Sequence, residues 1–210
     1  MTEPGPDARR PWVRRRILAV LAGGLVLGAG TATTLAAWTD TEYATGTITA
    51  SVFDTESQGS GDAAYASRPA APGAVLAFDV APVGPGSTRY AWVRIRTTGT
   101  TTVDGRAQLA AVTATGGLAP VLSYRAVVGA APGACAAPAF AAGATFIAGG
   151  PSTSIAAGAM PPTPVSFPLG AAAASPQEVC VEVTVAAGAA NSYQGTSATL
   201  SWQFTAQSAE

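Results

Sequence analysis

The sequence predicts an all-β protein, an antiparallel β-sandwich, and three observations lead to this fold class. After residue 37 the chain contains eight or nine short stretches in which apolar and polar residues alternate, as in strands with one buried face. Gly and Pro residues, which number 24 and 16 in the whole chain, mark the turns between these stretches. No long stretch with helical periodicity and no repeat of fixed period follows residue 37. Short alternating strands with Gly and Pro turns indicate a sandwich of two sheets.

The first predicted strand is Thr47–Phe53. Its residues Ile48, Ala50 and Val52 alternate with Thr and Ser, which is the pattern of a half-buried strand. Residues 57–73 are polar, aperiodic and rich in Gly, Ala and Pro, so they are predicted to form a loop.

Residues 75–80 are a short strand candidate, and the turn cluster 81–87 separates them from a longer strand, Arg89–Thr97. In this strand, one face would carry Ala91, Val93 and Ile95, and the other Tyr90, Trp92, Arg94 and Arg96. The second face has two interpretations. Aromatic residues and Arg are enriched at contact surfaces, but they also occur on an ordinary amphipathic outer sheet face.

The middle of the chain alternates between strands and loops. Strands are predicted at residues 103–113, 120–128, 145–148 and 165–169. The first of them would place Val103, Ala107, Leu109 and Ala111 on one face. The loops are residues 129–144, which contain Cys135, and residues 149–164.

The two clearest strands are the last ones, Val179–Ala186 and Ser197–Gln207. In the first, Val179, Val181, Val183 and Val185 share a face, opposite Cys180, Glu182 and Thr184. This would place Cys180 on the face away from the core, where it could tether an overlying loop. In the second, the core face consists of Ala198, Leu200, Trp202, Phe204 and Ala206.

Residues 1–37 have the layout of a secretory signal peptide, which would form a helix ahead of the sandwich. Five Arg residues precede residue 17, the run Ile17–Leu27 is apolar, and small residues lead to Trp38. This order is typical of a cleaved export signal, and we place the cut after Ala37. The whole uncharged run is also close to the ~20 residues that span a bilayer, so an uncleaved membrane anchor is the alternative. The predicted domains are a signal peptide, 1–37, and a secreted domain, 38–210.

Charge and cysteine content restrict the partners of this domain. After residue 37 the chain has six Arg, no Lys and ten acidic residues, so its formal charge is 6 − 10 = −4. It offers no basic stripe for nucleic acid or anionic lipid, and a membrane contact is expected only through an uncleaved signal segment. Two cysteines, Cys135 and Cys180, follow the signal. An even number in an exported chain predicts one disulfide, and two reduced thiols are the alternative.

The two ends of this domain carry a family resemblance. Thr34-Leu-Ala-Ala-Trp-Thr-Asp40, followed by Ala44-Thr-Gly-Thr-Ile-Thr-Ala-Ser51, is similar to the exit region of proteins cut by the SipW-type signal peptidase. The closing stretch Asn191-Ser-Tyr-Gln-Gly, with Phe204-Thr-Ala-Gln207 after it, resembles the last strand of the same proteins. The chain thus resembles the TasA/camelysin-like exported proteins. The resemblance implies a jelly-roll-like sandwich, a signal peptidase as partner during export, and a place in biofilm matrix or on the cell surface.

The sequence contains no histidine, and with it the common catalytic motifs that need this side chain are missing. Camelysin-like proteins have been described as metalloproteases, but this chain has no His and therefore no H-E-x-x-H zinc motif. A Ser-His-Asp triad and a Cys-His pair are excluded for the same reason. No Ca²⁺ loop pattern is present. We therefore predict no catalytic, metal or cofactor site, and a protein that is not an enzyme.

Two classes of function fit these observations. The first is a secreted structural protein of the cell surface or biofilm matrix, a fibre subunit that assembles by strand addition. After cleavage, the segment Trp38–Gly46 would be a free N-terminus without Pro, and its backbone could pair with a sheet edge of a neighbour while Trp38 or Tyr43 fills a pocket. The second is a monomeric cell-surface module that binds a partner or a glycan.

Overall fold

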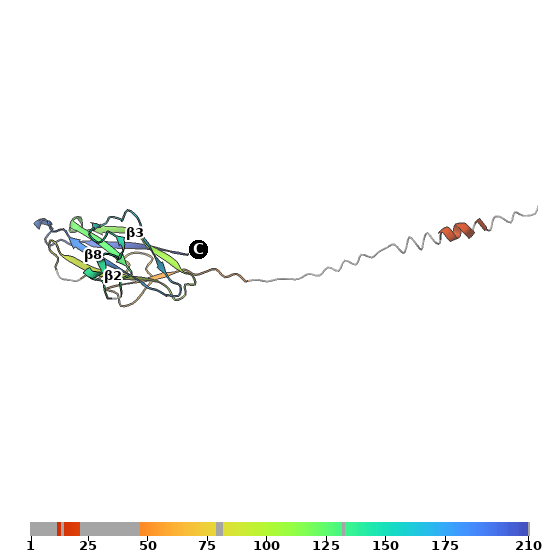
Figure 1. The fold of residues 1–210 in the computed structure, drawn as a ribbon, viewed down its shortest axis with the longest axis horizontal. Coiled ribbons are helices and arrows are strands. Elements are labelled where there is room, and N and C mark those ends of the chain that lie inside the picture. The colour runs from red at the N-terminus through yellow and green to blue at the C-terminus, as the bar shows by residue number, and fades with distance from the viewer. Residues whose placement is uncertain (1–11, 14, 22–46, 79–81, 132, 210) are drawn as a thin grey trace, which may run out of the picture. The chain divides into compact units, whose positions relative to one another are not determined.

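The computed structural model describes residues 12–13, 15–21, 47–78, 82–131 and 133–209 (Figure 1). The chain divides into two units, Met1–Ile48 and Thr49–Glu210. In the first unit, residues 15–21 are helical and overlap the apolar run of the predicted signal peptide. The described part of the chain contains no helix that is long and apolar enough to cross a membrane. The predicted domain boundary between residues 37 and 38 lies outside the described residues.

The second unit is an antiparallel β-sandwich, which confirms the predicted fold class. Sheet A consists of β1 (Thr55–Gly59), β2 (Thr88–Thr97), β4 (Leu122–Val128), β5 (Thr145–Ala148), β6 (Ile155–Ala156) and β8 (Gln177–Val185), and sheet B of β3 (Gly105–Thr115), β7 (Ser166–Leu169) and β9 (Thr199–Ser208). Sheet A has the order β1-β2-β8-β4-β5, with β6 beside β4, and sheet B the order β7-β3-β9. From β2 onward the chain changes sheet at every connection except those joining β4, β5 and β6. This alternation is a jelly-roll-like winding.

The core lies between the two sheets and is built by the alternating strands. The predicted inner residues of β2 (Ala91, Val93 and Ile95) are at most 6% exposed. Val179 and Val181 of β8 are fully buried. At the centre stands Tyr124, whose hydroxyl donates a hydrogen bond to the Ala159 carbonyl at 2.8 Å. Burial raises the pKa of Tyr124 to about 12, so this hydroxyl stays protonated and anchors the loop that follows β6.

The prediction of a first strand at residues 47–53 is wrong. These residues form no strand, and the side chains of Ile48 and Val52 are 97% and 47% exposed. An alternating pattern gives a strand only where a neighbour pairs with the backbone, and no described strand lies beside this segment. The first strand of the sandwich is β1, in a stretch partly predicted as loop. β1 has no apolar alternation and is held on β2 by pairing that includes an ion pair, Glu56 with Arg96, at 2.8 Å.

Smaller differences between the predicted and the observed strands have local causes. The register between β3 and β9 shifts between Leu109 and Ala111, so the buried face passes to Val112 instead of Ala111 as predicted. Such a bulge cannot be read from alternation, because one extra residue reverses the faces. Residues 75–78 are not a strand, and 79–80, the rest of that prediction, lie outside the described residues. The predicted loop 149–164 contains the short strand β6.

Candidate functional site

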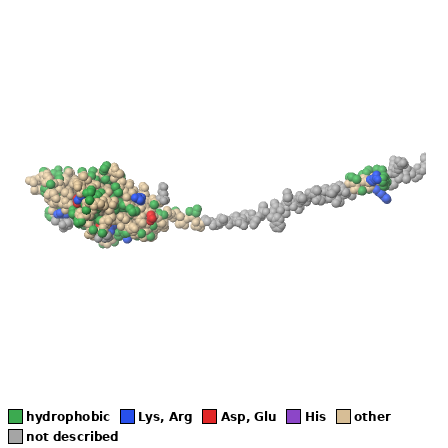
Figure 2. Space-filling view, viewed as in Figure 1, with side chains coloured by type: hydrophobic (Ala, Val, Ile, Leu, Met, Phe, Trp, Pro, Cys, Tyr) green, Lys and Arg blue, Asp and Glu red, His purple; other side chains and the backbone are tan. Residues whose placement is uncertain are grey.

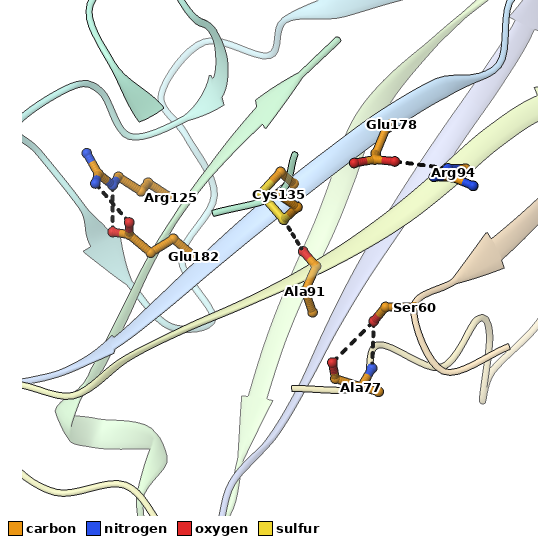
Figure 3. Close-up of a disulfide and its surroundings, with 9 residues drawn as sticks. Ser60, Ala77, Ala91, Arg94, Arg125, Cys135, Glu178 and Glu182 are labelled. Carbon is orange, nitrogen blue, oxygen red and sulfur yellow. Dashed lines mark hydrogen bonds and ion pairs between the residues drawn. A yellow bond between two sulfur atoms is a disulfide. The ribbon is translucent and has the colours of Figure 1, made fainter. Parts of the chain in front are cut away.

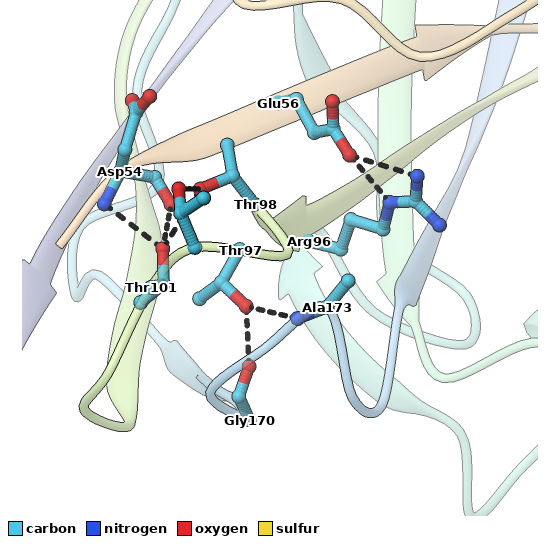
Figure 4. Close-up of polar contacts among 9 residues, drawn as sticks. Asp54, Glu56, Arg96, Thr97, Thr98, Thr101, Gly170 and Ala173 are labelled. Atoms are coloured by element: carbon cyan, nitrogen blue, oxygen red, sulfur yellow. Dashed lines mark hydrogen bonds and ion pairs between the residues drawn. The ribbon is translucent and has the colours of Figure 1, made fainter. Parts of the chain in front are cut away.

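Three of the predicted site residues, Ala37, Trp38 and Tyr43, lie outside the described residues. The structure does show where the chain joins the sandwich after them. The Val52 amide donates to the Thr102 hydroxyl oxygen at 2.9 Å, and the Asp54 amide to the Thr101 hydroxyl oxygen at 3.2 Å. Figure 4 shows Asp54 tied to this turn between β2 and β3.

The Phe53 ring then packs against Gly105, the first residue of β3. A Cβ atom at Gly105 would lie 2.3 Å from a carbon of that ring, so only glycine fits there. Gly105 pairs with Ser208, the last residue of β9. The chain therefore joins the sandwich at the end of β9.

The open edge of β9 is the candidate assembly site. β9 pairs with β3 on one side, and no described strand pairs with its other side. The Ala209 amide donates to the Asp104 carbonyl at 2.8 Å. Because backbone groups alternate in direction along an antiparallel strand, the N–H group of Gln207 also points toward β3, and those of Ala206 and Ser208 point away from it. No described residue bonds these outward groups, which an added strand could use.

The other sheet edges have features that oppose strand addition. β7 has four residues and contains Pro168, which has no N–H to donate. β5 also has four residues, and its pairing with β4 contains a register shift. β6, which also pairs with β4, has only two residues. β1 carries the charged Glu56, and its last residue, Gly59, lies against the Val75 backbone. β9 has ten residues, TLSWQFTAQS, with neither charge nor Pro. It is therefore the sheet edge best suited to pairing.

Ion pairs between neighbouring strands occupy the outer face of sheet A (Figure 3, Figure 4). They join Arg94 to Glu178 at 2.9 Å, Arg96 to Glu56 at 2.8 Å and Arg125 to Glu182 at 2.6 Å. Each pair stands directly opposite in the strand register. The Arg94 guanidinium also lies 4.3 Å from the Trp92 ring centre. The charges of the predicted contact surface are thus paired within the sheet, which favours its interpretation as an outer sheet face.

Tyr90 belongs to the same network. Burial, and then the hydrogen bond and charge of Glu182, raise the pKa of Tyr90 above its usual value. Hydrogen bonding to Glu182 raises the pKa of the Arg125 guanidinium, with burial opposing it. Both groups therefore keep their protons over the physiological range and hold the Glu182 carboxylate in place.

The predicted disulfide between Cys135 and Cys180 is confirmed (Figure 3). It fixes the loop 129–144 over the outer face of β8, as predicted from the side of the strand that carries Cys180. Phe140 of this loop packs with Val127 and Cys180 of sheet A in a second buried cluster between the loop and the sheet. β8 is consequently buried on both faces, and Glu178 and Glu182 are only 3% and 7% exposed.

The described residues show no arrangement for metal chemistry, because no group of three or more His, Cys, Asp or Glu residues lies together there. The outer face of sheet B carries a shallow hollow of about 210 Å³. Its lining includes Arg106, Gln108, Ser166, Thr205 and Gln207. Arg106 donates a hydrogen bond to the Ser166 hydroxyl at 3.1 Å. Among the residues that line the hollow, no nucleophile stands next to a base.

Comparison with known proteins finds neither a family model nor a curated protein that matches this chain. The similarity to the TasA/camelysin-like proteins therefore stays a prediction that rests on the residues at the two ends of the domain.

Asp62 fastens the segment after β1 and makes stability depend on pH. Its Oδ2 accepts hydrogen bonds from the amides of Gly59 at 2.8 Å and Val75 at 3.0 Å, and its Oδ1 lies 3.0 Å from Arg68. Partial burial acts to raise the pKa of Asp62, but these hydrogen bonds and Arg68 together outweigh it and hold the pKa below the ordinary 3.8. We expect Asp62→Asn to lower the free energy of unfolding by about 1 to 2 kcal/mol at neutral pH.

The sign of the pH effect follows from the lowered pKa. A carboxylate whose pKa is lower in the folded state stabilises the fold above its unfolded pKa of 3.8 and loses this effect as the pH falls through its folded value. The free energies of unfolding of the wild type and of Asp62→Asn can be measured in urea at a series of pH values from neutral into acid. We expect the difference between them to disappear only below pH ~4. A difference that is constant down to the most acid step would contradict the assignment.

Proposed function

We propose that this chain is a secreted, non-catalytic structural protein of the cell surface or biofilm matrix, whose copies assemble by adding a strand to β9. The observation that carries the proposal is the open edge of β9, ten residues long and without charge or Pro. Each added main-chain hydrogen bond contributes only about 1 kcal/mol net, so several must form together with an aromatic anchor in a pocket.

The proposed donor is the N-terminal segment Trp38–Gly46 of another copy, with Trp38 or Tyr43 as the anchor. Nine residues (46 − 38 + 1) are a close match to the ten of β9. A segment from a neighbour can pair in the antiparallel direction, which is slightly more stable per residue. Head-to-tail addition is heterologous and produces open filaments.

Export is the second part of the proposal. The basic, apolar and small-residue parts of residues 1–37 support removal by a signal peptidase after Ala37. The disulfide also fits an oxidising compartment outside the cytoplasm. Other matrix or cell-wall components are the further partners that we propose for the assembled protein.

The proposal predicts that the N-terminal segment decides assembly. N-terminal sequencing of the exported protein should find Trp38 as its first residue. A purified chain starting at Trp38 should form filaments, and one starting at Thr47 should stay monomeric, as seen by light scattering and electron microscopy. If both chains stay monomeric, or both polymerise equally, the segment is not the connector.

A variant of β9 tests the acceptor. Ala206→Pro removes an N–H group that points away from β3, and it leaves the hydrogen bonds between β3 and β9 in place. Ala206→Val keeps that N–H group and serves as the matched control, with circular dichroism to check the fold of both. We expect Ala206→Pro to abolish filaments and Ala206→Val to retain them. Equal assembly of the two variants would place the contact elsewhere.

A monomeric cell-surface binding module is the second candidate, and the hollow on sheet B favours it. Hydroxyl, amide and guanidinium groups around this hollow suit the hydroxyl groups of a glycan. This function would appear as a stable monomer with saturable glycan binding that Arg106→Ala weakens.

A further inference from the structure

Residues 74–78 cross the open side of the sandwich from β1 to β9, and we call them the strap. Ala74 and Leu76 pack against the main core cluster. The Phe78 ring lies next to Trp202 of β9, with ring centres 6.4 Å apart. The strap therefore covers the inner face of β9 beside its open edge, without itself being a strand of either sheet.

Four hydrogen bonds, three of them to side chains, hold the strap in place. The Val75 carbonyl accepts from the Gly61 amide at 2.9 Å, and the Val75 amide donates to Asp62 at 3.0 Å. The Ser60 hydroxyl bonds both the amide and the carbonyl of Ala77, at 2.9 and 3.3 Å (Figure 3). A segment with few bonds and little buried area opens at a lower cost than the strands around it.

An unpaired polar group on Trp202 also lowers the free-energy cost of opening the strap. The indole N–H of Trp202 is buried and has no hydrogen-bond acceptor among the described residues. A buried donor without an acceptor costs free energy, which the indole recovers when the strap opens and the N–H reaches water. The closed state is thus less favourable at Trp202, which belongs to the strand with which the added segment would pair.

We infer that the strap is an autoinhibitory cover, which must lift from β9 before another copy can add its strand. In the closed state Phe78 and Leu76 occupy the side of the sandwich that the new strand needs. Opening uncovers Trp202 and the inner face of β9 together. This regulation rests on the proposed function, whereas opening of the strap is a property of the single chain and can be measured on it.

Hydrogen exchange of the monomer, with the chain starting at Trp38, tests opening by itself. The Val75 and Ala77 amides should exchange at least tenfold faster than the amides of β8, because the strap opens without unfolding the sandwich. Ser60→Ala removes the bonds to Ala77 and should speed strap exchange further, without changing exchange in β8. Strap amides that exchange as slowly as β8 would overturn the inference, whatever the state of assembly.

A locked strap tests the link to assembly. A Cβ atom at Gly61 would lie 3.2 Å from the Ala77 Cβ and 2.9 Å from Val75 Cγ1. A shift of a few tenths of an ångström brings the two Cβ atoms into the ~3.5–4.5 Å range of a disulfide, so Gly61→Cys with Ala77→Cys can form a reversible lock. Mass spectrometry checks its pairing against Cys135 and Cys180. The oxidised double variant should assemble at least tenfold more slowly than either single variant, and mild reduction should restore its rate.

The outcomes separate the two proposals. A locked variant that assembles at the rate of the single variants overturns the autoinhibitory strap and leaves strand addition standing. If the unmodified chain does not assemble, strand addition fails, and the exchange of Val75 and Ala77 alone decides whether the strap opens.

Discussion

Replacing Cys135 and Cys180 with Ala is expected to lower the free energy of unfolding by about 4 kcal/mol. The disulfide closes a loop of 45 residues, and the chain-entropy relation gives roughly this value as an upper figure. For a domain of this size, the melting temperature should fall by on the order of ten degrees. The loop 129–144 should show the largest rise in hydrogen exchange, because Phe140 loses the bond that holds its loop on β8.

Reduced wild-type protein is the control that separates the missing bond from the missing atoms. It keeps both sulfur atoms, so any additional loss in the double Ala variant measures the small cavity left at Cys180, which is fully buried. Thiol titration of the unfolded, unreduced protein should find no free thiol. Two reactive thiols, or equal stability of the oxidised and reduced forms, would contradict the prediction.

The sequence predicts strands well where burial alone specifies them. β2, β8 and β9 each alternate because one face packs on the core, and all three appear where the pattern places them. β1 is different: its polar residues are held by pairing with β2, including the ion pair of Glu56 with Arg96, whose positions are 40 residues apart. No local pattern carries that information. Residues 47–53 show the converse, since they alternate clearly but have no described strand beside them.

The features of the candidate site also fall into two groups, those that the local sequence predicts and those that depend on the arrangement of all the strands. The disulfide was predictable from the number of cysteines, and the core face of β9 from alternation. That β9 lies at a sheet edge depends on the order of all the strands, which alternation does not determine. For a related reason, the sequence predicts a strand at residues 75–80, where the structure has the strap. Its apolar residues 74, 76 and 78 alternate as in a strand, but Asp62 and Ser60 take the backbone groups that a neighbouring strand would need.

Replacing Arg125 with Met is expected to lower the free energy of unfolding by about 3 to 5 kcal/mol. Arg125 holds Glu182 through two hydrogen bonds, at 2.6 and 2.8 Å, and both side chains are largely buried, at 18% and 9% exposed. Without Arg125, the Glu182 carboxylate stays beneath the loop 129–144 with its charge uncompensated. The variant also loses the guanidinium over the Phe140 ring, 4.8 Å from its centre, and the bond to the Pro151 carbonyl. Urea unfolding at neutral pH measures the effect.

Two controls show whether burial sets the size of this effect. Arg96→Met breaks an ion pair of the same type on the same face, but Arg96 and Glu56 are 30% and 19% exposed, so we expect a loss nearer ~1 kcal/mol. Adding Glu182→Leu to Arg125→Met removes the uncompensated charge and should recover most of the stability, since apolar side chains pack well at such a site. If Arg125→Met and Arg96→Met cost the same, or the double variant is weaker than Arg125→Met alone, burial of Glu182 does not control the energy. The pair would then contribute no more than an exposed surface ion pair.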